Sequence, residues 1–277
     1  MHWPDEPSAD VTRVADDHTP VLPWPRNPMK KLIVFDLDGT LATSKQAIDT
    51  EMAELFAELL KLCAVAVISG GDWPQFERQL LGMLPPLGNY NKLFLLPTSG
   101  TKFYRFDGVW SQIYADDFSV DERERVMNAL THAAAQAGFA DETIWGEQIE
   151  DRGSQITFSG LGQDAKPDVK ASWDPDIQKR NRLKTLLDVR LPDFAVRIGG
   201  STSVDITKPG IDKAYGIGKL AVVSGFDPSE MLFIGDALYP GGNDAPVRDA
   251  GVATIAVHDI ADTKLVIETI IKLAGPA

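Results

Sequence analysis

The sequence has a single cysteine, fewer basic than acidic residues and no long apolar run. Cys63 excludes a disulfide within the chain, and we expect a reduced, cytoplasmic setting. There are 27 Lys and Arg against 40 Asp and Glu, and the net charge of −13 argues against nucleic acid as a partner, because a phosphate backbone is bound by basic side chains. No apolar run approaches the ~20 residues of a membrane span. The N-terminus lacks the basic-then-apolar pattern of a signal peptide.

What remains is the composition of a soluble globular protein. The 277 residues are 44% hydrophobic and 24% charged, which is ordinary for a chain with a packed core. The length suffices for one large or two moderate domains. Residues 1–28 contain six prolines without hydrophobic periodicity, so we expect an extended or disordered tail there.

Residues 31–41 are the most informative stretch. Leu32 to Phe35 is a short apolar run, typical of a strand buried on both faces of a parallel sheet. Asp36 and Asp38 follow at the carboxyl end of this expected strand, which is where ligands bind in an open α/β sheet. Gly39 then allows a sharp turn. Two carboxylates this close repel each other. A hard divalent cation with oxygen ligands would relieve the repulsion, and Mg²⁺ is the usual one beside phosphate.

Three later stretches have a similar character. Ser69 and two glycines follow the apolar run 62–68, where a hydroxyl and backbone N–H groups can bind phosphoryl oxygens. Lys213 opens a helix, although the helix dipole disfavours a cation there. Met231 to Ile234 is another apolar run, followed by Asp236 and a Gly-rich loop that carries further polar residues. Each stretch alone could be an ordinary turn or a surface lysine, so the interpretation depends on their order along the chain.

The order of expected elements predicts an α/β fold. Strands and helices alternate up to about residue 96 and again after residue 213, which indicates a Rossmann-like, doubly wound parallel sheet. Between them the order is αββαββ, which favours an antiparallel sheet covered on one face. We therefore expect an inserted domain. The predicted division is a tail at 1–28, core segments at 29–111 and 208–277, and the insertion at 112–207.

These stretches resemble the motifs of the haloacid dehalogenase (HAD) superfamily of phosphotransferases, and the insertion is like the C2b cap of its subclass IIB. Within that subclass the chain is similar to the eukaryotic-type phosphomannomutases from about residue 31 to residue 277. The stretches that carry this similarity are Asp36-Leu-Asp38-Gly-Thr-Leu, Ser69-Gly-Gly-Asp72, Gly199-Gly-Ser-Thr-Ser203-Val-Asp205, Asp212-Lys213 and Pro240-Gly-Gly-Asn-Asp244.

The resemblance implies a role for each matched residue. Asp36 would be the nucleophile that forms an aspartyl-phosphate. Asp38 would be the general acid/base and would give its backbone carbonyl to Mg²⁺. Lys213 would pair with the nucleophile and the phosphoryl group, which Ser69 would also bind. The remaining predicted metal-site residues are Asp236, as a direct ligand, and Asn243 and Asp244, which would hold the metal's waters; the predicted substrate-binding residues are Thr40, Gly70, Arg152, Ser203 and Asp205.

The residues of the cap distinguish between two activities that the resemblance allows. A hexose-phosphate mutase holds a second phosphate with cap arginines, and Arg152 matches one of them. Trp145 and Gln163 stand where two others are expected, although Lys166, Lys170 or Arg197 could compensate. This favours hydrolysis of a small phosphate monoester, a sugar phosphate, over the alternative, phosphomannomutase activity. A second alternative is a non-catalytic phosphosugar-binding protein, which the complete set of motif residues argues against. Pairing of two copies through the cap is a further expectation.

Overall fold

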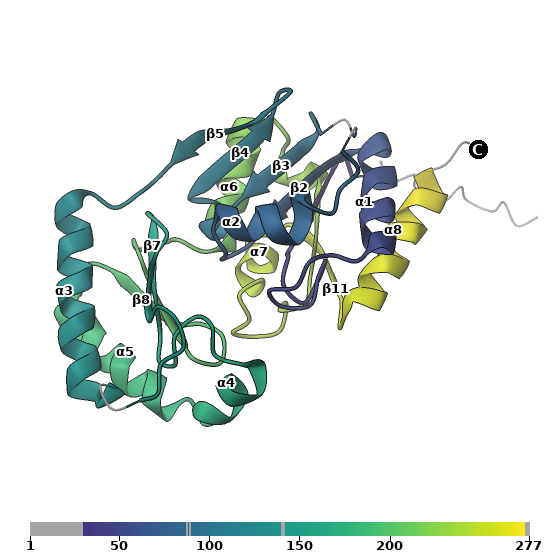
Figure 1. Cartoon of the computed structure of the whole chain (residues 1–277). Helices are drawn as coiled ribbons and strands as arrows, with labels where there is room; N and C mark the ends of the chain where they lie inside the picture. The colour runs from purple at the N-terminus through teal and green to yellow at the C-terminus, as the bar shows by residue number, and fades with distance from the viewer. Residues whose placement is uncertain (1–29, 87, 89, 140–141, 275–277) are drawn as a thin grey trace, which may run out of the picture.

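The computed structural model describes residues 30–86, 88, 90–139 and 142–274, so the predicted N-terminal tail lies outside the described residues. A seven-stranded sheet has the order β11-β10-β1-β2-β3-β4-β5 (Figure 1). The first five strands in this order are parallel, which confirms the doubly wound sheet. The strands are β1 (Leu32–Phe35), β2 (Ala64–Ile68), β3 (Leu93–Leu96), β4 (Lys102–Phe106), β5 (Trp110–Ala115), β10 (Met231–Gly235) and β11 (Ala253–Ala256).

Helices cover both faces of this sheet. Alternate residues of β1 point to opposite faces, so Ile33 and Phe35 pack with α1 and α8, whereas Leu32 and Val34 pack with α6 and α7. Continuous burial of β1, β2 and β3 follows from this two-sided cover, as their apolar runs predicted. The core helices are α1 (Thr50–Leu62), α2 (Trp73–Phe76) with a π-helical turn at Glu77–Leu81, α6 (Lys213–Ser224), α7 (Ala245–Asp249) and α8 (Ile260–Ala274).

The hairpin of β4 and β5 was not predicted. Its turn contains Asp107-Gly108, a dipeptide that favours tight hairpin turns, and Gly108 has a φ of +75°. β5 pairs antiparallel with β4 from Trp110 to Ala115. The predicted boundary between residues 111 and 112 therefore falls inside a strand of the core sheet, and the first core segment extends to Ala115. The boundary was placed too early because β5 is an exposed edge strand and has no continuous apolar run that would mark it in the sequence.

The inserted unit is a four-stranded antiparallel sheet, β6-β7-β9-β8, with α3 and α5 covering one face (Figure 1). Apolar side chains of α3 and α5 pack on Ile156, Phe158, Val204 and Ile206 of the two middle strands. This confirms the α/β cap domain of the predicted fold. The cap consists of α3 (Val120–Ala137), β6 (Ile149–Asp151), β7 (Gln155–Ser159), α4 (Pro167–Trp173), α5 (Gln178–Arg190), β8 (Ala195–Ile198) and β9 (Ser203–Thr207).

The cap has one helix more than the predicted αββαββ order. A buried ion pair stabilises the junction of the additional helix, α4, with α5. The Asp174 carboxylate accepts hydrogen bonds from the backbone N–H of Lys179 and Arg180 and from the Arg180 Nε, the last at 2.8 Å. The side chains of Asp174 and Arg180 are only 1% and 6% exposed. Removing either partner would leave a buried, uncompensated charge.

No helix in the described part of the chain is both long and apolar enough to cross a membrane.

Candidate active site

The ends of two neighbouring strands carry the carboxylates. β1 and β10 pair in parallel with Phe35 opposite Ile234, so Asp36 and Asp236 follow strands that end side by side. Asp36 N also donates to Ile234 O at 3.0 Å. The carboxyl ends of adjacent parallel strands meet at one edge of a sheet, which is why residues 200 positions apart in sequence share one site.

Lys213 is the centre of a buried charge cluster. Its Nζ donates to Asp36 Oδ1 at 2.6 Å and to Asp244 Oδ1 at 2.5 Å. Lys213, Asp36 and Asp244 are 2%, 4% and 0% exposed. The Asp212 side chain accepts a hydrogen bond from Tyr215 N and caps α6. This cap makes Lys213 the first residue of the helix. The structure thus brings together the predicted nucleophile and the predicted lysine.

Burial changes the ionisation of this cluster. Loss of water contact raises the pKa of the Asp36 carboxyl to about 7; the neighbouring Asp244 adds to the rise, and Lys213 opposes it. For Lys213, burial alone would lower the pKa of the ammonium group, but the two carboxylates outweigh it and raise this pKa above its ordinary value. The lysine therefore stays charged beside Asp36, the predicted nucleophile.

The carboxylates fit a divalent cation. One oxygen from each of Asp36, Asp236 and Asp244 lies within 4.8 Å of the others. Three carboxylates and one lysine leave two uncompensated negative charges when all are ionised, and a hard divalent ion with oxygen ligands would balance them. Asp244 was predicted to hold only the metal's waters, but its carboxylate lies within the cluster itself and also accepts from Ala237 N at 2.9 Å.

Two residues of the first motif hold Asp236 in place. The Thr40 hydroxyl accepts a hydrogen bond from Asp236 N at 3.1 Å and donates to Asp236 Oδ1 at 3.3 Å. Gly39 has a φ of +88°, and a Cβ built there would lie 2.5 Å from Asp236 Oδ2. The glycine is therefore required by conformation and by space. Thr40 was predicted to bind substrate, and in the structure it is buried against the carboxylate cluster.

Asp38 lies outside the carboxylate cluster. Its Oδ1 accepts from Lys45 N at 2.7 Å and from Gln79 Nε2 at 3.1 Å, and its Oδ2 accepts from Gln75 Nε2 at 2.7 Å. The two glutamines were not recognised in the sequence. The available signal was their spacing of four residues on the helix predicted after Asp72, which places them on one face.

The Ser69-Gly-Gly loop of the core contacts the cap through Arg152. Ser69 is buried, and its Oγ accepts from Gly71 N at 3.1 Å. Arg152, from the turn between β6 and β7, donates to Gly70 O at 2.7 Å and to Glu150 Oε2 at 2.6 Å. The predicted substrate arginine is therefore already engaged by a core carbonyl and by a carboxylate of its own sheet.

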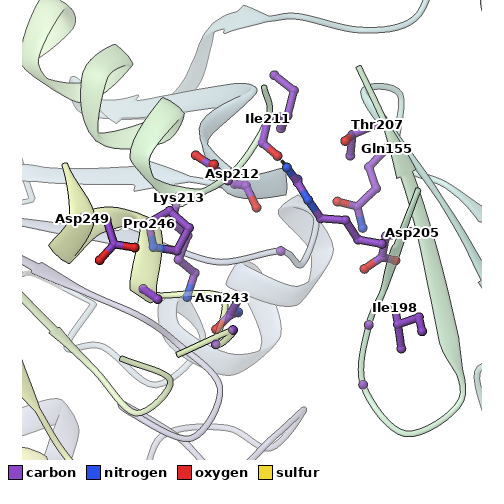
Figure 2. Close-up of a pocket in the computed structure, with 18 of the residues that line it drawn as sticks. Gln155, Ile198, Asp205, Thr207, Ile211, Asp212, Lys213, Asn243, Pro246 and Asp249 are labelled. Carbon is purple, nitrogen blue, oxygen red and sulfur yellow. Dashed lines mark hydrogen bonds between the residues drawn. The ribbon is translucent and has the colours of Figure 1, made fainter. Parts of the chain in front are cut away.

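A cavity of about 730 Å³ lies between the core and the cap, a size suited to a small ligand. In Figure 2, Asp205, Gln155 and Thr207 of the cap strands stand opposite Lys213 and Asn243 of the core. Gly70 also lines this cavity. The cavity therefore has one wall from each domain, and Lys213 is where it meets the buried cluster; the carboxylates of Asp36, Asp236 and Asp244 lie behind Lys213 and are not among the lining residues.

The cap wall is polar but has few free charges. Asp205 accepts from the Thr157 hydroxyl at 2.7 Å, and burial raises the pKa of its carboxyl, although Arg152 and Thr157 oppose the rise. Arg197 lines the cavity and donates to the backbone carbonyl of Ile211. Ser203, two residues before Asp205 on β9, is not among the residues that line the cavity.

A second polar group lies where the first motif's loop meets the cap. Lys45 Nζ is 3.4 Å from Gln163 Oε1, and Lys170 Nζ donates to Gln163 O at 2.7 Å. Burial and the nearby Lys45 lower the pKa of Lys170. Within the described ranges neither lysine forms an ion pair with a carboxylate. Trp145, the other departure from the mutase pattern, is 38% exposed.

Comparison with known proteins decides the family. The sequence model of the family described as "Eukaryotic phosphomannomutase" matches residues 52–273. The chain belongs to the eukaryotic phosphomannomutase family. This confirms the predicted resemblance and makes the chain an enzyme of the HAD superfamily.

Individual members of the eukaryotic phosphomannomutase family are distant relatives. The chain is 27% identical over 222 residues to the phosphomannomutase of Schizosaccharomyces pombe, an alignment that covers 78% of this chain and 84% of that protein. It is 25% identical over 256 residues to the phosphomannomutase of Dendrobium officinale, covering 89% of this chain and 97% of that protein.

Solved structures share the fold of this family member. An N-terminally truncated IMP-nucleotidase of Plasmodium falciparum superposes with a TM-score of 0.65 at 17% identity, covering 88% of this chain and 71% of that one. A haloacid dehalogenase-like hydrolase from Bacteroides thetaiotaomicron gives a TM-score of 0.58 at 18% identity, covering 87% and 99%. At these identities the likeness concerns the fold alone.

Proposed function

We propose that this chain is a Mg²⁺-dependent phosphohydrolase that acts on a small sugar phosphate through an aspartyl-phosphate on Asp36. The observation that carries the proposal is the buried Lys213 ammonium between Asp36 and Asp244, beside a cavity that core and cap residues line together. One oxygen each of Asp36, Asp236 and Asp244 lies within 4.8 Å of the other two. A lone acidic turn would not need a buried lysine. A non-catalytic binding protein would not need a complete set of motif residues.

The chemistry would occur in two steps. Asp36 Oδ attacks phosphorus, the bond from phosphorus to the sugar oxygen breaks, and Asp38 gives that oxygen a proton. A water molecule then attacks the phosphorus of the aspartyl-phosphate, Asp38 takes the water's proton, and phosphate leaves with Asp36 restored. Lys213 stabilises the negative charge on the transferring group throughout, since its ammonium is fixed in place before substrate enters.

The acidic cluster would hold Mg²⁺ through Asp36, Asp236 and Asp244, with Asn243 and the Asp38 backbone carbonyl as the further predicted contributors. When bound, the ion would neutralise phosphoryl charge and favour the ionised form of Asp36. This role is consistent with the raised pKa of Asp36, because the protein alone does not keep that buried carboxyl fully ionised at neutral pH.

Hydrolysis is the favoured outcome because the cap offers little to a second phosphate. Arg152 is engaged by Glu150 and Gly70 O, and Arg197 by Ile211 O. Asp205 is acidic and would suit sugar hydroxyls rather than a phosphate. The ligand that fits this wall is a largely neutral leaving group with several hydroxyls.

Phosphomannomutase activity is the second candidate, and two observations favour it. One is that the chain belongs to the eukaryotic phosphomannomutase family. The other is that Lys45 and Lys170 both bind Gln163, and neither forms an ion pair with a carboxylate in the described part of the chain. Two ammonium groups held close together would suit an anion such as a second phosphate.

A substrate panel with Mg²⁺ separates the two candidates. Mannose 1-phosphate and mannose 6-phosphate are supplied with and without a hexose bisphosphate, and both released phosphate and isomerised sugar phosphate are measured. Phosphate release that needs no bisphosphate supports the hydrolase. Bisphosphate-dependent interconversion with little phosphate release would replace it with the mutase. Neither product from any sugar phosphate would contradict both.

The proposal also includes a cytoplasmic setting and pairing of two copies through the cap. Cys63, the single cysteine, is buried, and burial raises the pKa of its thiol to about 11, so it stays an unreactive core residue.

A further inference from the structure

Three donors surround the carboxylate of Asp38. Gln75 Nε2 donates to one oxygen at 2.7 Å, while Gln79 Nε2 and Lys45 N share the other at 3.1 and 2.7 Å. All three are N–H groups without a net charge, and two come from amide side chains one helical turn apart. Both oxygens, and hence the plane of the carboxylate, are fixed by this arrangement.

The helix that carries the glutamines is itself rigidly held. The Asp72 carboxylate accepts from Trp73 N at 2.7 Å and pairs with Lys102 at 2.7 Å. The Trp73 ring stacks on Tyr104 of β4, with ring centroids 3.9 Å apart. Between Gln75 and Gln79 the backbone passes into the π-helical turn at Glu77–Leu81, a distortion that frequently occurs at functional sites.

The two glutamines differ in how firmly they are placed. Gln79 is 1% exposed, and its Nε2 also donates to Gln46 O at 2.6 Å. Gln75 is half-buried, and Asp38 is the only partner of its amide nitrogen among the hydrogen bonds of the described residues. Gln79 is therefore part of the fold as well, whereas the contact of Gln75 serves Asp38 alone.

We propose that Gln75 and Gln79 are positioning residues that hold Asp38 for proton transfer. This inference rests on the proposed role of Asp38 as general acid and base. Without the amides the carboxylate keeps only the Lys45 N–H and can rotate away from the sugar oxygen. The expected loss from removing one amide is about 10-fold, smaller than the roughly 10²–10⁴-fold that a positioned proton transfer contributes in full.

Leaving-group dependence distinguishes positioning from general support of the fold. kcat/KM is measured for mannose 6-phosphate, whose alkoxide leaves only when protonated, and for p-nitrophenyl phosphate, whose phenolate leaves without a proton. Gln75→Met, which keeps the length of the side chain, should lower kcat/KM about 10-fold for the sugar phosphate and less than about 2-fold for the aryl phosphate. Gln79→Met should act in the same sense if it folds.

Two comparisons complete the test. Gln75→Glu keeps the shape but replaces donors with a carboxylate, so it should lower the sugar-phosphate rate further than Gln75→Met. Glu77→Gln on the same helix is the control, since its exposed side chain has no contact with Asp38, and it should leave both rates unchanged. In an Asp38→Asn background, Gln75→Met should cause no additional loss, because the interaction is already gone.

Equal losses on the two substrates, or a full additional loss in the Asp38→Asn background, would overturn the inference and indicate a structural role. An unchanged sugar-phosphate rate in Gln75→Met would overturn it as well. The proposed function fails separately, if Asp36→Asn or Asp38→Asn retains the wild-type rate in the same assay.

Discussion

The two walls of the cavity are built on different principles. On the core wall, Lys213 lines the cavity and donates hydrogen bonds to Asp36 and Asp244 behind it, and all three residues are almost completely buried. On the cap wall, Arg197 is exposed and Asp205 is half-buried, and each interacts with its own surroundings rather than with a shared centre. The core wall is thus fixed for one chemistry, whereas the cap wall can change residue by residue, which is how one fold serves many substrates.

Breaking the core wall should have the largest effect. Asp36→Asn keeps the shape of the side chain but removes the attacking charge, so turnover should fall roughly 10⁴-fold or more. Steady-state kinetics on mannose 6-phosphate measure the loss, and circular dichroism checks that the fold is intact. Asp107→Asn, in the exposed turn between β4 and β5 and outside the cavity lining, is the matched control and should stay near the wild-type rate. Near-normal turnover in Asp36→Asn would contradict the mechanism.

Removal of the metal should abolish the chemistry of the core residues and leave the structure of the cap unchanged. Chelation of Mg²⁺ should abolish phosphate release, and Ca²⁺ should restore it poorly, because its longer bonds and looser geometry misplace the phosphoryl group. Phosphate release is measured after dialysis against EDTA and after each ion is added back. Full activity in the chelated protein would exclude the proposed cofactor.

Removing the buried ion pair of the cap should lower the stability of the protein rather than its catalytic rate. Asp174→Ala leaves Arg180 buried without its partner and should reduce the free energy of unfolding by about 3–5 kcal/mol. Urea unfolding measures this loss, with Asp188→Ala, whose carboxylate pairs on the exposed face of α5, as the control. A loss below about 1 kcal/mol would mean that the pair is not a stabilising element.

The same pair predicts a pH dependence. Burial works to raise the pKa of the Asp174 carboxyl, but Arg180 and two backbone N–H groups hold it below its ordinary 3.8. Because the folded-state pKa lies below the unfolded one, the contribution is present above pH 3.8 and is lost as the pH falls through the folded-state value. The stability difference between wild type and Asp174→Ala should therefore shrink in acid.

The smallest effect is expected from adding charge to the cap. Gln163→Arg places a third cation beside Lys45 and Lys170 and should strengthen hexose bisphosphate binding by roughly 1.5–3 kcal/mol if the guanidinium reaches the phosphate. Hydrolysis of a monophosphate should change little. Calorimetric titration with a bisphosphate measures the first effect and phosphate release the second. Unchanged bisphosphate affinity would show that this corner of the cap does not face the ligand.

The positions of the proposed site residues of the core could be predicted because they depend on local patterns. A buried parallel strand is a continuous apolar run, and its carboxyl end is the next residue, so Asp36 and Asp236 were found from the chain alone. The edge strand β5 and the helix α4 were missed because neither has such a run; β5 is an exposed hairpin strand, and α4 has no buried residue.

The strand ends, the order of the motifs and the presence of an inserted domain can all be found in the sequence, since each follows from hydrophobic periodicity and from residues adjacent in the chain. The side-chain partners, in contrast, depend on how the chain folds. The tertiary structure placed the Asp244 carboxylate directly on Lys213, tied Arg152 to Gly70 O, and set two glutamines against Asp38. These contacts join residues 31 to 82 positions apart, and their geometry is set by how helices pack on the sheet and how the cap closes on the core, which no local pattern specifies.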